Sequence, residues 1–245
     1  MKKLIVMSGK GGVGKSTVAA NIAFALTMKG YKVGLLDSDV HGPSIPKILG
    51  LEDVKGLEVV EGKLKPAEVD GLKVVSIQFL LPSRDSPVVW RGPMKHKFLE
   101  QIFKDVHWGK LDYLIIDCPP GTGDEVISVV QLAKPDAVVI VTTPQSVALE
   151  DVRKAINFAK KGVKKIFLIE NMSGLICPHC GNKIDVFGVG GGKKLAEETG
   201  VTFLGSVPLD PEIMKSCEEG KPFVKLNMNS AKIFKEIVDK LVQEI

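Results

Sequence analysis

Nine residues near the start of the chain have the types and spacing of a phosphate-binding loop. An apolar run, Leu4–Met7, precedes them and an amphipathic segment, Val18–Met28, follows, which predicts a strand before the loop and a helix after it. Glycines allow successive backbone N–H groups to face one anion, and the start of a helix adds positive potential. We therefore expect a nucleoside triphosphate to bind at Gly9, Lys10, Gly11, Gly12, Val13, Gly14, Lys15, Ser16 and Thr17.

Two lysines in this loop have different expected roles. Lys15 can reach the β- and γ-phosphates, and the Ser16 hydroxyl beside it can ligate Mg²⁺. Lys10 directly follows the first glycine, which resembles the deviant loop of the MinD, ParA and nitrogenase iron protein class. That resemblance implies that Lys10 crosses a dimer interface to the partner's nucleotide, as an arginine finger does elsewhere. The alternative is a solvated lysine on a flexible loop.

Carboxylates follow two further predicted strands. Lys32–Leu36 leads into Asp37 and Asp39, and the apolar run Leu114–Ile116 ends at Asp117 in a Walker B pattern. The carboxyl ends of parallel strands meet at the ligand-binding edge of a sheet. Of the first pair, one carboxylate can hold Mg²⁺ through water and the other can orient or deprotonate the attacking water, while Asp117 is expected in the Mg²⁺ shell. The alternative for the first pair is a turn stabilised by aspartates.

Three other positions are candidate contacts. Gly121 lies in a Pro-Gly turn after Asp117, which predicts a switch loop whose N–H senses the γ-phosphate. Asn171 follows the predicted strand Lys164–Glu170, and its amide suits an adenine edge because it both donates and accepts hydrogen bonds. Arg91 is a candidate phosphate or interface contact, with a plain surface arginine as the alternative.

Two of the four cysteines form a CxxC pair, Cys177 and Cys180. A proline and a glycine at this spacing are typical of a metal-binding knuckle. Zinc ions and iron–sulfur clusters each require about four thiolate or imidazole ligands, so one pair supplies half of a site. The site is completed within the chain or by a second copy across a two-fold axis. The candidates within the chain are Cys118, Cys217 and His179.

Two of these candidate ligands are not favoured, and the CxxC pair itself has two alternative functions. Cys118 follows Asp117 and is expected near the phosphates, and Cys217 lies on a predicted helix, so neither is a favoured ligand. A dithiol oxidoreductase would place the first cysteine at the start of a helix, whereas a loop with Gly181 follows here. A structural zinc that bridges two chains is the other alternative.

Length and composition indicate an ordinary globular protein. The chain has 245 residues, 44% hydrophobic and 25% charged, and a net charge of +4. This charge is too small and too evenly spread to favour nucleic acid or an anionic membrane as a partner. No apolar stretch is long enough to span a bilayer, and we expect a cytoplasmic location.

Strands and helices alternate along the whole chain, which predicts an α/β fold with one doubly wound, mostly parallel sheet flanked by helices. We expect a single P-loop NTPase domain over residues 1–245, with a metal-binding loop at about 174–185. Residues 51–78 predict a hairpin excursion with a return strand, Lys73–Ile77. The expected final helices are Lys193–Glu198, Pro211–Glu218 and Ser230–Val242.

Taken together, these motifs resemble the Mrp/ApbC family of P-loop iron–sulfur cluster carriers, with the deviant Walker A loop. The resemblance covers nearly all of the chain. It includes Lys10–Thr17, Leu36–Asp39, Gly42–Pro46, Trp90–Met94, Asp117–Glu125, Glu170–Ser173, Cys177–Gly181, Phe187–Gly191 and Gly205–Asp210.

This resemblance implies a homodimer in which Cys177 and Cys180 of both copies hold one bridging [4Fe–4S] cluster. It also implies ATP binding with Mg²⁺, slow ATP hydrolysis, and transfer of the cluster to apo iron–sulfur proteins. The matching positions imply that Asp39 is the switch residue near the attacking water and that Asp37 and Asp117 surround Mg²⁺. Asn171 and Pro208 are implied as nucleotide contacts.

Two other classes of function compete with a cluster carrier. One is a nucleotide-switched positioning protein that resembles MinD or ParA, with a structural zinc at the CxxC pair. Its membrane helix would be the amphipathic C-terminal segment Phe234–Val242, whose mixed charge instead favours packing against the protein. The other is a metabolic kinase or synthetase, for which the sequence offers no acceptor-substrate signature.

Overall fold

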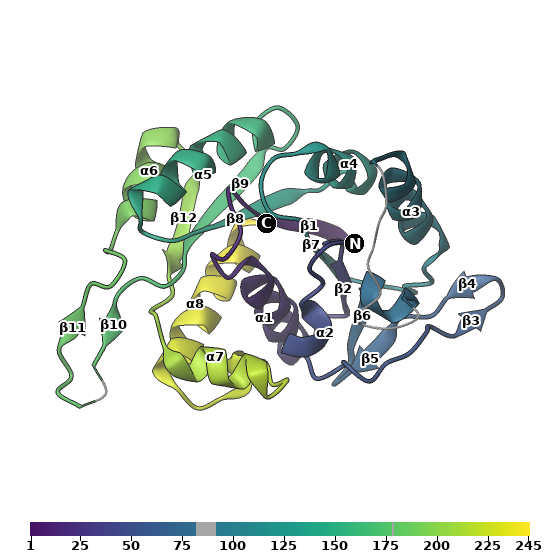
Figure 1. The fold of residues 1–245 in the computed structure, drawn as a ribbon, viewed down its shortest axis with the longest axis horizontal. Coiled ribbons are helices and arrows are strands. Elements are labelled where there is room, and N and C mark those ends of the chain that lie inside the picture. Colours follow the sequence, from purple (N-terminus) through teal and green to yellow (C-terminus); the bar gives the residue numbers. More distant parts are fainter. Residues whose placement is uncertain (82–91, 178) are drawn as a thin grey trace.

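The computed structural model describes residues 1–81, 92–177 and 179–245. In this part of the chain eight strands form one sheet in the order β12-β9-β8-β1-β7-β2-β6-β5 (Figure 1). All neighbouring pairs are parallel except β5 and β6, which run antiparallel at one edge. In that order, the strands are Thr202–Ser206, Lys165–Glu170, Ala137–Thr142, Lys2–Ser8, Tyr113–Asp117, Val33–Asp37, Leu72–Ser76 and Ala67–Val69.

Helices cover both faces of this sheet (Figure 1). One side carries α1 (Lys15–Met28), α2 (Ile45–Ile48), α7 (Pro211–Glu218) and α8 (Asn229–Glu244). The other side carries α3 (Gly92–Asp105), α4 (Asp124–Ala133), α5 (Ser146–Ala159) and α6 (Gly191–Thr199). Short 3₁₀ turns span Ile77–Leu80 and Phe223–Lys225.

The central strands are apolar on both faces because both faces are covered. In β1, Leu4 and Val6 belong to the core beneath α1 and α8, whereas Ile5 and Met7 belong to the core beneath α3–α6. This division follows from the two-residue period of a strand. The polar residues that follow these strands are therefore brought together at one edge of a rigid sheet.

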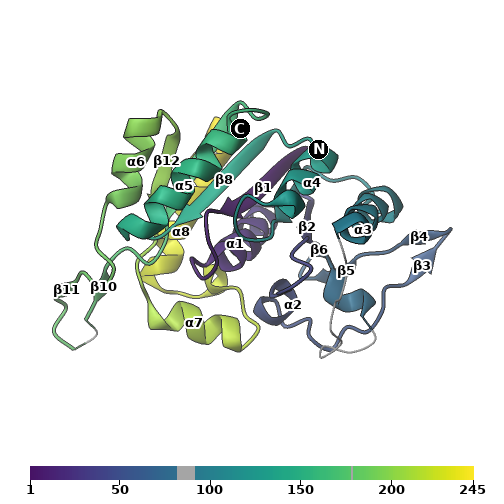
Figure 2. The ribbon, with the colours of Figure 1, turned by 45° about the horizontal axis from the view of Figure 1, so that its top comes forward.

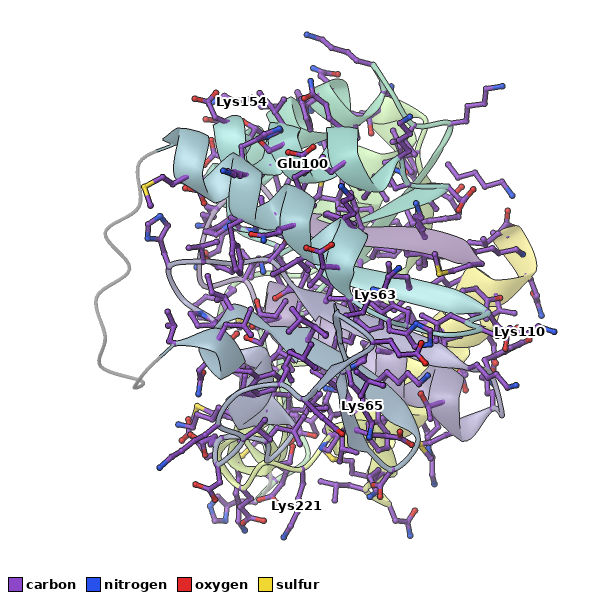
Figure 3. All side chains as sticks on the ribbon, turned by 90° about the vertical axis from the view of Figure 1, so that its right-hand side faces the viewer. Lys63, Lys65, Glu100, Lys110, Lys154 and Lys221 are labelled. Atoms are coloured by element: carbon purple, nitrogen blue, oxygen red, sulfur yellow. The ribbon has the colours of Figure 1, made fainter. Side chains whose placement is uncertain are left out.

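Two small hairpins project from opposite ends of the molecule (Figures 1 and 2). One pairs β3 (Val59–Val60) with β4 (Lys63–Leu64), and the other pairs β10 (Leu175–Ile176) with β11 (Lys183–Ile184). Charged side chains stand outward on the face that carries the first hairpin, among them Lys63 and Lys65 (Figure 3). Among the described helices, none is both long and apolar enough to cross a membrane.

The expected α/β class and mostly parallel sheet are confirmed, and several strands begin or end within one or two residues of the prediction. Two local features were not predicted. Helix α4 begins at Asp124, directly after the Pro-Gly turn, where only a switch loop was expected. The cysteine pair lies in a loop, as expected, but the short strands β10 and β11 that flank this loop were not predicted. Two-residue strands carry no periodic pattern that a sequence can reveal.

Gly34 in β2 tests how tightly the sheet packs. A Cβ atom there would lie 2.8 Å from Leu111 Cδ1 and from Trp108 Cε3. We expect Gly34→Ala to lower the free energy of unfolding by about 1–3 kcal/mol, as overpacking of cores does. Gly162→Ala is the control, because a Cβ there would meet no atom within 4 Å. Urea unfolding followed by circular dichroism measures both variants; equal midpoints would contradict this packing argument.

Candidate functional site: the nucleotide edge and the cysteine hairpin

The glycine loop joins β1 to α1 and has the backbone conformations that the sequence requires. Gly12 and Gly14 have φ angles of 80° and 83°, in the left-handed region that favours glycine. Gly14 also lacks room for a side chain, since a Cβ would lie 2.2 Å from Asn171 Nδ2. Gly9 is likewise confined, because its Cβ would meet the α5 backbone at Asp151 at 2.6 Å. The loop is therefore held from two sides by α5 and by the end of β9.

Lys15 is buried beside the Walker B acid. Its Nζ lies 2.6 Å from Asp117 Oδ1 and 3.1 Å from Ser16 Oγ. Burial opposes the charged ammonium, but Asp117, followed by Asp37 and Asp39, outweighs it and raises the pKa of Lys15. Lys15 is therefore a fixed cation at the base of the loop.

Asp37 and Asp117 are aligned by the sheet itself, because they pair in register across β2 and β7. Their side chains are 1% and 0% exposed, respectively. Burial, followed by the neighbouring Asp117 carboxylate, raises the pKa of Asp37 from 3.8 to about 8. Two adjacent buried acids share one lysine, so Asp37 keeps a proton in the absence of another cation, and a divalent cation can replace that proton.

Two serines hold these acids in place, and neither was predicted from the sequence. Ser76 Oγ donates to Asp37 Oδ2 at 3.0 Å, and Ser38 Oγ donates to the Asp117 carbonyl at 2.6 Å. Both serines lie at or next to a strand end. A hydroxyl beside a strand-end aspartate is the sequence signal that could have identified them.

The residues around the acids fit a hydrated Mg²⁺ ion. Asp117 Oδ2 is buried and has no hydrogen-bond partner among the residues that the structure describes. Within the same residues, no group of three or more His, Cys, Asp or Glu side chains is arranged to hold a metal directly. Mg²⁺ usually keeps several waters and uses one or two carboxylates with substrate phosphates, so this arrangement suits it.

Asp39 and Gly121 lie on the two loops beside the phosphate loop. Asp39 Oδ1 accepts from the N–H groups of His41 and Gly42, each at 3.2 Å, so its carboxylate also closes its own turn. Gly121 has a φ of 87°, and its N–H donates to the Ser8 carbonyl at 3.0 Å. Sensing of a γ-phosphate by this N–H would require that hydrogen bond to open.

A cavity of about 260 Å³ lies over the phosphate loop. It is bordered by both loop lysines, by Asp39 and by Pro120 of the second loop. Its full lining is Ser8, Lys10, Gly11, Gly12, Gly14, Lys15, Ser16, Thr17, Asp39, Ser44, Ile48 and Pro120. Asp39 and most of the phosphate loop therefore line one cavity, and Lys10 lies at its border.

Asn171 contacts the loop rather than standing apart from it. Its Nδ2 donates to the Val13 carbonyl at 2.9 Å, and its side chain is buried. Pro208 follows Val207, whose N–H donates to the Glu170 carbonyl, so both residues expected to contact the nucleotide lie beside the end of β9. Arg91 lies outside the described residues.

The cysteine pair lies in the turn between β10 and β11. The Gly181 N–H donates to the Cys177 carbonyl at 2.9 Å, and Gly181 has the left-handed φ of 72°. The backbone N–H groups of Cys180 and His179 lower the pKa of the Cys177 thiol. Thiolate is the form that binds metal, so the turn favours a metal ligand.

The other two cysteines lie elsewhere. Cys118 is completely buried in the core beneath α3–α6, where burial raises the pKa of its thiol. Cys217 lies on α7 with its Sγ 4.0 Å from Thr17 Oγ1. Cys118 therefore cannot reach the hairpin without unfolding the core, and the Cys217 thiol contacts the phosphate-loop end of α1.

The raised pKa of Asp37 makes a prediction about stability without Mg²⁺. Between about pH 4 and pH 8 the folded protein keeps a proton on Asp37 that the unfolded chain releases. Raising the pH through this window therefore destabilises the wild type, by up to about 1.4 kcal/mol per pH unit. In urea unfolding with EDTA, the free energy of unfolding of Asp37→Asn should rise relative to that of the wild type as the pH rises from about 5 to about 8. Parallel curves for the two proteins would contradict this assignment.

Comparison with known proteins places this site in a family. The family model ParA, described as NUBPL iron-transfer P-loop NTPase, matches residues 1–242. Iron-sulfur cluster carrier proteins of Methanocaldococcus jannaschii and Pyrococcus horikoshii are 47% and 49% identical, over 99% of this chain and 84% and 86% of theirs. The cytosolic Fe-S cluster assembly factor CFD1 of Saccharomyces cerevisiae is 46% identical over 97% of this chain and 86% of its own.

Solved structures agree with this result. A nucleotide-binding protein of Archaeoglobus fulgidus in complex with ADP has a TM-score of 0.82 and 39% identity, covering 95% of this chain and 91% of that one. The cell division ATPase MinD of Pyrococcus furiosus has a TM-score of 0.73 and 25% identity, covering 99% and 98%. The resemblance to P-loop iron–sulfur cluster carriers is confirmed, and the chain belongs to the ParA/NUBPL family of iron-transfer P-loop NTPases.

Proposed function

We propose that this protein is an ATP-hydrolysing iron–sulfur cluster carrier. In this proposal two copies hold one [4Fe–4S] cluster between their CxxC pairs and pass it to apo iron–sulfur proteins. The observation that carries the proposal is the presence, in one chain, of a phosphate loop beside buried acids and a turn that lowers the pKa of one cysteine of a CxxC pair. Relatives at 46–49% identity are named as cluster carriers or assembly factors.

The nucleotide half of the proposal follows from charge. Loop N–H groups and Lys15 bind the phosphates of ATP, while Asn171 and Pro208 lie beside the base. Ser16, Asp37 and Asp117 hold Mg²⁺, the two aspartates through water; bound Mg²⁺ supplies positive charge to the β- and γ-phosphates. Asp37 would release its proton on Mg²⁺ binding, because the ion supplies the positive charge that Lys15 alone does not.

Hydrolysis needs an oriented water and a second cation. Asp39 accepts a proton from the water as it attacks the γ-phosphorus, and the products are ADP and inorganic phosphate. Lys10, at the rim of the loop cavity, contacts the nucleotide of the partner copy, so hydrolysis depends on dimer formation. Gly121 acts as the switch that reports the γ-phosphate. Dependence on a second copy is consistent with slow hydrolysis.

The cluster half of the proposal follows from ligand number. One chain offers Cys177 and Cys180 at the hairpin turn, and a [4Fe–4S] cluster takes four thiolates, so two copies complete it. Exposed apolar side chains lie on the same segment as the pair, which favours a protein partner over solvent there. They are Ile176 at 55%, Ile184 at 46%, Val186 at 49% and Val189 at 44% exposure.

The whole chain, residues 1–245, then acts as one NTPase domain with the metal-binding segment 174–185. A cytoplasmic location is part of the proposal, supported by a relative whose name describes a cytosolic assembly factor. Neither nucleic acid nor membrane is required as a partner. The alternative is a MinD-like nucleotide switch with a structural zinc at the cysteines, supported by the MinD structure at 25% identity.

Cysteine variants test the proposal directly. We expect anaerobically reconstituted wild type to contain iron and acid-labile sulfide for one cluster per two chains. Cys177→Ser and Cys180→Ser should each lose the cluster, because they remove two of its four ligands from the dimer. The matched control is Cys217→Ser on α7, which should keep wild-type iron and sulfide.

The assay also separates the two candidate functions. Zinc without sulfide in the wild type would support the MinD-like switch and contradict the carrier. Retention of the full cluster by Cys177→Ser would show that other residues hold it. Circular dichroism of each variant establishes that its fold is intact.

A further inference from the structure

Glu170, the last residue of β9, is a buried carboxylate that the nucleotide site does not use. Its side chain is 0% exposed. Oε1 accepts from Ser173 Oγ at 2.5 Å, from the Gly190 N–H at 2.9 Å and from Ser206 Oγ at 3.3 Å. Oε2 accepts from the Gly192 N–H at 2.6 Å. The donors that the described residues supply are thus two hydroxyls and two backbone N–H groups.

Three of these donors lie where the cysteine-bearing segment begins and ends, and we call these two places its roots. Ser173 precedes β10, whereas Gly190 and Gly192 lie at the start of α6, after β11. A single carboxylate therefore fastens both ends of residues 173–190, the stretch that carries the cysteine turn. We call these contacts the Glu170 clamp.

Helix α6 explains how an acid can be buried here. The first turn of a helix has free N–H groups and a positive end, which together stabilise an anion. Gly192 allows the close approach, because a Cβ there would lie only 3.1 Å from Glu170 Cβ and Oε2. Loss of the carboxylate would leave buried N–H and O–H donors without acceptors, at a cost that would loosen the two roots.

The next residue along the chain faces the nucleotide site. Asn171 Nδ2 donates to the Val13 carbonyl, and the same atom would lie 2.2 Å from a Cβ at Gly14. Successive side chains at a strand end point to opposite faces. Met172 then turns the chain with a φ of 57°, a left-handed conformation that is uncommon outside glycine. Two adjacent residues thus connect the phosphate loop to both roots of the cysteine segment.

We propose that Glu170 is a positioning residue that couples the nucleotide site to the cysteine hairpin. A nucleotide on the phosphate loop shifts the Val13–Asn171 contact, and the Glu170 clamp transmits that shift to both roots of residues 173–190. Nucleotide state thereby sets the spacing and mobility of the Cys177–Cys180 turn. The coupling to cluster handling rests on the proposed function, whereas the coupling to the hairpin does not.

Hydrogen–deuterium exchange of the metal-free protein tests this coupling without a cluster. We expect Mg-ATP to change amide exchange in residues 173–190 of the wild type by about fivefold or more. In Glu170→Gln this nucleotide effect should disappear, because the amide nitrogen cannot accept the hydrogen bonds of the carboxylate. ATP affinity, measured by calorimetry, should stay within about twofold, since Glu170 touches no residue of the loop.

A pair of serine variants gives a matched control that disturbs the fold less. Ser173→Ala and Ser206→Ala each remove one hydroxyl that donates to the same oxygen of Glu170. Only Ser173 belongs to a root of the hairpin, so only Ser173→Ala should reduce the nucleotide effect on exchange. An equal effect in both variants would identify a general packing role and overturn the proposal. So would an undiminished nucleotide effect in Glu170→Gln.

Protein with a reconstituted cluster tests whether the Glu170 clamp also affects cluster retention. The rate of iron loss to a chelator should depend on Mg-ATP in the wild type and become independent of it in Glu170→Gln, with the initial cluster content unchanged. If the wild type binds no cluster, the proposed function fails while the exchange experiment still decides the coupling. If the cluster binds but the variant keeps the ATP dependence of iron loss, the coupling to cluster handling fails alone.

Discussion

The buried contact between Lys15 and Asp117 is the interaction on which the nucleotide edge depends. Two parallel strands end side by side and place Asp37 and Asp117 in register, where water cannot screen their charges. Lys15, at 2.6 Å, balances the charge of Asp117, and the raised pKa of Asp37 keeps a proton on the second acid. The site beneath the phosphate loop therefore favours a further cation, and we propose that Mg²⁺ bound together with a nucleotide takes this place.

The cysteine turn is attached to the same sheet, at the end of β9. It lies on a projecting hairpin with exposed apolar side chains, and its local backbone lowers the pKa of Cys177. What connects this hairpin to the nucleotide edge is the end of β9, where Glu170 and Asn171 face in opposite directions. Two polar groups at the end of one strand therefore form a short physical link between the phosphate loop and the cysteine hairpin.

Much of this arrangement could be predicted from the sequence because its signals are local. The loop Gly9–Thr17, the apolar strands and the strand-end aspartates are read directly from residue type and spacing. The role of Glu170 could not be read in this way, because its partners lie 3 to 36 residues away and two of them are backbone groups. Asn171 was expected to contact adenine; its observed bond to Val13 depends on the tertiary fold, and the adenine contact stays a prediction.

Native mass spectrometry of the anaerobically reconstituted protein tests the central claim most directly. The account predicts a dimer whose mass exceeds two chains by one [4Fe–4S] unit, and a monomer without iron after the cluster is removed. A monomer that carries its own cluster, or a dimer whose added mass is zinc alone, would contradict the claim that two cysteine hairpins share one cluster.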